Sequence, residues 1–146
     1  MLQVLHVQGV SHWAPANIGP YSQGVLSANQ LHVSGQIGSK PNQTSESEFA
    51  GLVPGSMDLA TGEAAQASLG LRHVDRVAKA MMPSISFNDV KRVICYVVGE
   101  EGARQADLKL RALDSSLSGL VTYFRVNQLP RGALVEWEIE YHQVLP

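Results

Sequence analysis

A strict alternation of apolar and polar residues near the C-terminus constrains the fold more than any other feature of the chain. The apolar and polar sets are Val135, Trp137, Ile139 and Tyr141 against Glu136, Glu138, Glu140 and His142. Successive side chains of a strand point to opposite faces of its sheet. Segment 134–144 therefore predicts a strand with one face in a core. An exposed strand face accounts for Glu138 and Glu140 as readily as a functional role does.

Two amphipathic helices offer the partners that such a strand needs. The first begins near Glu63 and ends before Pro83. Its apolar stripe recurs at spacings of three and four residues and consists of Ala67, Leu71, Val74, Ala78 and Met81. A second helix is predicted near 103–117. Its apolar face consists of Ala106, Leu110, Leu113 and Leu117.

Alternating and β-branched runs predict five further strands, near 2–9, 22–27, 31–37, 90–98 and 121–128. Strands that alternate with two amphipathic helices indicate an α+β fold, with a single mixed β-sheet and both helices packed on one face. The polar segment 38–53 predicts a surface loop. The second face of the sheet then needs a cover of its own.

The composition narrows the class of protein. A chain of 146 residues is expected to form one domain, residues 1–146. A net charge of −2 provides no basic surface for nucleic acid or an anionic membrane. No apolar run reaches the roughly 18–20 residues of a membrane span, and no secretory signal is visible, so we expect a cytoplasmic protein. The charged fraction of 16% is low and favours self-association.

The sequence indicates no metal site and no cofactor. Five histidines, His6, His12, His32, His73 and His142, show no ligand-like spacing with one another or with Cys95. Cys95 lies mid-strand among apolar neighbours, which predicts an inert thiol. As the only cysteine it excludes an internal disulfide and indicates a reducing compartment. No glycine-rich phosphate loop precedes a helix.

Three segments, Ala14–Gln23, Leu31–Gln36 and Leu129–Glu136, occur in an order that resembles the RidA/YjgF family, also labelled endoribonuclease L-PSP. They resemble in particular the RidA-like domains of eukaryotic diphthine–ammonia ligases, as does Leu71–Val77. The resemblance implies a chorismate mutase-like fold and a homotrimer, in which three subunits bring their open sheet faces together. It also implies a small-molecule ligand in clefts at the subunit interfaces.

The same resemblance implies which residues form the site. Glu136 falls where RidA-type deaminases carry the catalytic glutamate that holds a hydrolytic water. Tyr21 would line the cleft, and Ser34 with Gly35 would offer hydroxyl and backbone groups. The structural alternatives are a packed strand residue at Tyr21 and a strand bend at Ser34 and Gly35.

The chain departs from the deaminases at the residue that clamps the carboxylate of the ligand. Counted back from the Leu-Pro corner, the clamp arginine falls on Val121 and a family cysteine falls on Tyr123. Valine cannot form a bidentate pair with a carboxylate. Arg125 shares the strand face of Val121 but lies roughly 13 Å farther along. Arg131 is an exposed turn residue, a partner of Glu136, or a group that grips an anionic ligand.

Three functions remain open from the sequence. The first is a binding module for a small metabolite, for which the resemblance to the ligase domains implies an accessory role in diphthamide synthesis. The second is an enamine/imine deaminase of the 2-iminobutanoate/2-iminopropanoate type with altered specificity. The third is an endoribonuclease, against which the negative charge of the chain argues. The ATP-binding loop of the ligases does not occur in this sequence, so this chain alone is not predicted to be the ligase.

Overall fold

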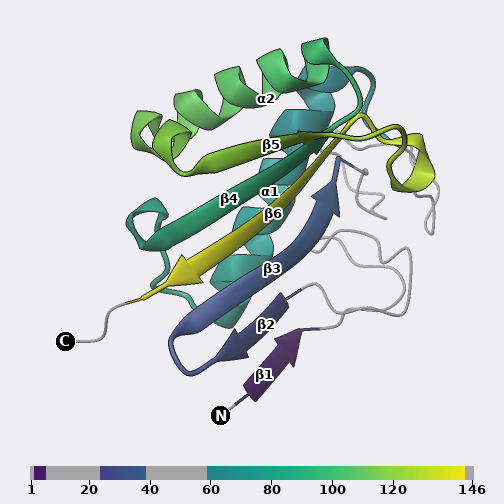
Figure 1. Cartoon of the computed structure of the whole chain (residues 1–146). Helices are drawn as coiled ribbons and strands as arrows, with labels where there is room; N and C mark the ends of the chain where they lie inside the picture. Colours follow the sequence, from purple (N-terminus) through teal and green to yellow (C-terminus); the bar gives the residue numbers. More distant parts are fainter. Residues whose placement is uncertain (1, 6–23, 39–58, 144–146) are drawn as a thin grey trace, which may run out of the picture.

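A computed structural model describes residues 2–5, 24–38 and 59–143. Six strands form one sheet in the order β1-β2-β3-β6-β4-β5 (Figure 1). The strands are β1 Leu2–Leu5, β2 Gly24–Ser27, β3 Gln30–Ile37, β4 Val90–Val97, β5 Val121–Arg125 and β6 Val135–His142. Only β4 and β5 pair in parallel, so the sheet is mixed. The predicted α+β class is confirmed.

Both helices, α1 Glu63–Met81 and α2 Glu100–Leu113, lie on the same side of the sheet (Figure 1). The main core forms between them and alternate residues of β3, β4 and β6. The apolar set of β6 lies in this core, and the acidic set is only partly buried on the opposite, open face. The predicted division of this strand is therefore confirmed.

Trp137 fixes β6 against α1. Its side chain is fully buried, and its indole Nε1 donates a hydrogen bond to the carbonyl of Ala67 at 3.0 Å. The ring can approach because position 70 is glycine. A Cβ there would lie 2.9 Å from Cδ1 of Trp137. The buried indole thus holds Glu136 and Glu138, its neighbours in sequence, on the open face.

The predicted second helix, 103–117, is wrong at both ends. It begins earlier, at Glu100, because Gly99 is the extended residue that precedes it. It ends at Leu113 because Asp114 leaves the helix with φ −163° and ψ 116°. The Asp114 carboxylate then accepts a hydrogen bond from the Ser116 backbone N–H at 3.0 Å. This bond caps a separate short helix, η2 Ser115–Gly119.

The predicted first helix, the strand at 31–37 and the strand at 90–98 are confirmed to within one or two residues. The strand predicted near 121–128 is shorter, ending at Arg125. Residues 6–9 and 22–23 of two other predicted strands lie outside the described residues, as does the predicted loop beyond Gly38. Within the described ranges, no helix is both long and apolar enough to cross a bilayer.

Candidate functional site

Three glutamates line the open face of β6, and their surroundings differ. Glu138 Oε1 lies 3.2 Å from His32 Nε2, and Glu140 Oε1 lies 2.6 Å from Arg92 Nη2. No ion pair or hydrogen bond to the Glu136 carboxylate is found among the residues that the structure describes. Glu136 is therefore the one carboxylate of this row without a cationic partner in the described part of the chain.

Glu136 lies against the backbone of β3. The pairing of β3 with β6 shifts register between Val33 and Gln36, which is a β-bulge. Within the bulge, a Cβ on Gly35 would lie only 2.8 Å from Cδ of Glu136 and 2.9 Å from its Oε2. Glycine at position 35 is thus what lets the carboxyl group pack onto the strand. The structure brings the predicted pair Gly35 and Glu136 into contact, with half-buried Ser34 beside them in sequence.

This environment changes the acidity of Glu136. Burial removes water from the carboxylate and raises its pKa above the ordinary value, and the negative charge of Glu138 raises it further. A carboxyl group with a raised pKa retains its proton to higher pH and can exchange it with a ligand. The arrangement can therefore supply a proton acceptor and donor beside an accessible strand.

The corner before β6 is fixed by a small second core of Ile37, Leu129 and Ala133. The turn η3, Pro130–Gly132, contains Arg131 with φ 61° and an exposed side chain. Asn and Asp tolerate this left-handed conformation better than arginine does, and Gly132 follows it with φ 73°. Arg131 is thus placed at the corner that leads into the Glu136 strand.

Gln66 was not singled out by the sequence, yet it positions this corner. It is buried on α1, accepts a hydrogen bond from the Leu134 backbone N–H at 2.8 Å and donates one to the Ala60 carbonyl at 3.0 Å. It therefore ties the start of β6 to α1. The only sequence signal was a polar residue next to the apolar stripe of the helix, and that signal is weak.

Val121 and Tyr123 lie on the other side of the sheet. Val121 pairs with buried Val93 and packs against the main core. The Tyr123 hydroxyl lies 3.5 Å from Asp107 Oδ1 on α2, and burial raises the pKa of Tyr123. Within one copy, the sheet therefore separates both residues from Glu136. The predicted ligand residue Tyr21 lies outside the described residues.

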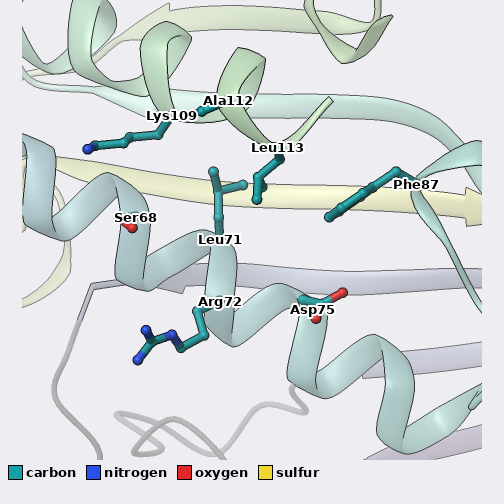
Figure 2. Close-up of a pocket in the computed structure, with 8 residues that line it drawn as sticks. All are labelled: Ser68, Leu71, Arg72, Asp75, Phe87, Lys109, Ala112 and Leu113. Carbon is teal, nitrogen blue, oxygen red and sulfur yellow. The ribbon is translucent and has the colours of Figure 1, made fainter. Parts of the chain in front are cut away.

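A hollow of about 450 Å³ lies between the two helices (Figure 2). Figure 2 shows Leu71 and Leu113 at its centre, with Lys109 and Arg72 toward one end and Phe87 toward the other. It opens on the helical side, away from Glu136. It is thus separate from the residues that the sequence predicted for the site.

Two other predictions concern sites of different chemistry. Cys95 is fully buried, and burial raises the pKa of its thiol, so it lacks the thiolate character of a nucleophile. In the described ranges, no group of three or more His, Cys, Asp or Glu side chains is placed to hold a metal ion.

No protein-family model matches the chain. The chain is 32% identical over 125 residues to the 2-iminobutanoate/2-iminopropanoate deaminase of Bos taurus. The aligned region covers 86% of this chain and 81% of that deaminase. The chain is 35% identical over 146 residues to the diphthine–ammonia ligase of Schizosaccharomyces pombe, covering 96% of this chain. The chain spans about a fifth of the length of that ligase, 21%.

Solved structures share the fold. The RidA protein of an Antarctic Psychrobacter superposes with a TM-score of 0.73 at 25% identity, covering 94% of this chain and all of the other, 100%. The YjgF gene product of E. coli superposes with a TM-score of 0.69 at 21% identity, covering 95% of this chain and 100% of the other. The second likeness shows a common fold alone.

Proposed function

Because the chain belongs to the RidA/YjgF family, we propose that it assembles as a homotrimer and binds a small metabolite in clefts between the copies, with Glu136 at the centre of each cleft. The observation that carries the proposal is the state of Glu136. It is half-buried on the sheet face opposite the helices and packed on Gly35, whereas its two neighbours on β6 are paired, Glu138 with His32 and Glu140 with Arg92.

The placement of the other predicted residues supports a shared cleft. Glu136 and Gly35 lie on the open face, whereas Val121 and Tyr123 lie under α2 at the edge strand β5. One copy cannot bring both pairs to one ligand, because its own sheet stands between them. A cleft that contains both pairs needs the open face of one copy and the β5 edge of another. Arg131 is exposed at the corner before β6. We assign it the role of binding an anionic ligand, because the position of the family's clamp arginine is occupied by Val121.

Hydrolysis of an imine is a second candidate, favoured by the raised pKa of Glu136. In that reaction, water adds to the C=N carbon of a 2-imino acid while the carboxylate takes a proton from the water. The same group returns that proton to nitrogen, which gives a carbinolamine. It then takes the proton of the new hydroxyl group and passes it to the amino nitrogen as the C–N bond breaks, and a 2-keto acid and ammonia leave. The Bos taurus relative is a deaminase of this type. A role beside a diphthine–ammonia ligase is a further proposal, since this chain matches only 21% of one.

Two measurements on the same variants test both candidates. 2-Iminobutanoate is generated in situ by an amino-acid oxidase, and 2-oxobutanoate binding is measured separately by calorimetry. We expect Glu136→Gln to weaken 2-oxobutanoate binding, and, if hydrolysis occurs, to slow it about 100-fold or more. Glu138→Gln is the matched control. It removes a carboxylate two residues along the same strand face, one that already has a histidine partner.

The outcomes separate the candidates. Binding without acceleration of imine hydrolysis leaves the binding module as the function. Acceleration that Glu136→Gln abolishes and Glu138→Gln preserves establishes the deaminase. If neither binding nor hydrolysis responds to Glu136→Gln, the proposal is wrong.

A further inference from the structure

Two aromatic side chains continue the row that begins at Glu136. In the sheet register, Glu136 of β6 is directly opposite Tyr96 of β4, and Tyr96 is directly opposite Phe124 of β5. Residues opposite one another on neighbouring strands project from the same face. The carboxyl group and the two rings therefore stand side by side across three strands of the open face.

The two rings are in contact and unequally covered. Their centroids lie 5.8 Å apart with an angle of 27° between the ring planes. Tyr96 packs on the second core of Ile37, Leu129 and Ala133, which holds its ring in place. Phe124, at the outer end of the row, leaves 48% of its surface exposed. A fixed ring thus supports a second ring that is open to a ligand.

The spacing of the row matches a particular kind of ligand. Neighbouring strands are about 4.8 Å apart, so the row from Glu136 to Phe124 spans roughly 10 Å. A ligand whose imine or keto carbon lies at Glu136 and whose side chain is one or two methyl groups ends before Phe124. A ligand with a phenyl ring one carbon beyond the reacting carbon lies over Tyr96, with the far edge of its ring toward the Phe124 ring.

We propose, on the basis of the function proposed above, that the Glu136 cleft selects 2-imino or 2-keto acids with an aromatic side chain, whose ring stacks on Tyr96 and Phe124. Stacked or edge-to-face aromatic pairs contribute beyond the area that they bury, which gives an aromatic ligand an advantage over a small aliphatic one. Tyr96 and Phe124 then act as specificity-determining residues, and Glu136 serves both ligand classes equally.

The test compares two acids that share one head group. Dissociation constants of phenylpyruvate and 2-oxobutanoate are measured by calorimetry on the assembled protein. We expect phenylpyruvate to bind on the order of tenfold more tightly. Phe124→Ala weakens phenylpyruvate binding by a larger factor than 2-oxobutanoate binding and so removes this preference, and Phe124→Leu, which keeps most of the apolar volume, retains part of it. Leu113→Ala is the control, since Leu113 is 47% exposed but lies on the helical side.

The contrary outcomes are distinct. Equal binding of the two acids, or equal weakening of both by Phe124→Ala, overturns the aromatic selection and leaves the proposed function intact. Loss of the assembled state in both Phe124 variants also overturns it, because the ring is then a contact between copies. Failure of both acids to bind the unaltered protein overturns the proposed function as well.

Discussion

The glutamates of β6 share a strand face, and what each one touches decides what it can do. Glu140 and Glu138 face Arg92 and His32, and such exposed or half-exposed pairs contribute little to stability. Glu136 instead packs on the β3 backbone, where its charged form is disfavoured. The protein thus keeps an ionisable group where burial disfavours its charge, which is typical of a functional site.

The pH dependence of stability tests that cost. The pKa of Glu136 in the folded protein is raised above 4.5, so the folded state binds more protons than the unfolded state from about 4.5 up to the raised pKa. Over that window the free energy of unfolding falls as pH rises. Glu136→Gln removes the ionisation, so we expect the variant to gain stability relative to the unaltered protein as pH rises from 4 to 7 in urea titrations.

The control for this measurement is Glu140→Gln, which removes a carboxylate that is paired with Arg92 at 2.6 Å. It should show no such gain at neutral pH. A Glu136→Gln variant whose stability relative to the unaltered protein is the same at pH 4 and pH 7 would show that the carboxyl group is well solvated in the folded state.

At the scale of the element, β6 is positioned by the indole on its other face. Trp137 reaches the Ala67 carbonyl through the space that Gly70 leaves in α1, and Gln66 holds the start of the strand. These contacts with α1 fix where β6 lies along the helix and which of its faces points into the core. The position of Glu136 is thus a consequence of how β6 docks on α1.

Gly70→Ala tests this docking. Alanine favours a helix interior over glycine by about 1 kcal/mol, so helix propensity alone would stabilise the variant. The added Cβ would lie 2.9 Å from the buried Trp137 ring, and overpacking of this kind costs about 1–3 kcal/mol. We expect a net loss of stability in urea unfolding. Ser68→Ala, at an exposed position of the same helix, should gain about 0.5 kcal/mol. A gain of stability in Gly70→Ala would contradict the account.

Periodicity in the sequence was enough to predict most elements and the two faces of β6, because side-chain alternation within a strand depends on that strand alone. It could not predict which strands are neighbours. The row of Glu136, Tyr96 and Phe124 depends on the register of β4 with both of its neighbours, and the contact with Gly35 depends on a bulge. The early end of α2 depends on Asp114, whose carboxylate caps the next short helix, η2, by accepting hydrogen bonds from the backbone N–H and the hydroxyl of Ser116.

Because periodicity does not show how strands are arranged, it also could not predict on which face of the sheet Val121 and Tyr123 lie. The family resemblance grouped them with Glu136 as ligand residues, and nothing in the sequence showed on which face of the sheet β5 would place them. The structure pairs Val121 with Val93, a core residue, and so places both on the helical side. Their role as ligand residues stays a prediction that requires a second copy.

For the whole molecule, the two faces of the sheet are unequal. The two helices cover one face (Figure 1). Among the described residues, the other face presents half-buried glutamates, Tyr96 and the exposed ring of Phe124. The closed threefold assembly proposed above would cover three such faces at once. The proposed cleft requires in addition that the open face of each copy lie beside the β5 edge of another.

Light scattering across a range of concentrations gives the molar mass of the protein in solution and so decides whether the cleft can form between copies. We expect three times the mass of one chain, constant down to the concentrations at which 2-oxobutanoate binds. A protein that has the mass of a single chain under those conditions, and still binds the ligand through Glu136, would show that the cleft does not form between copies.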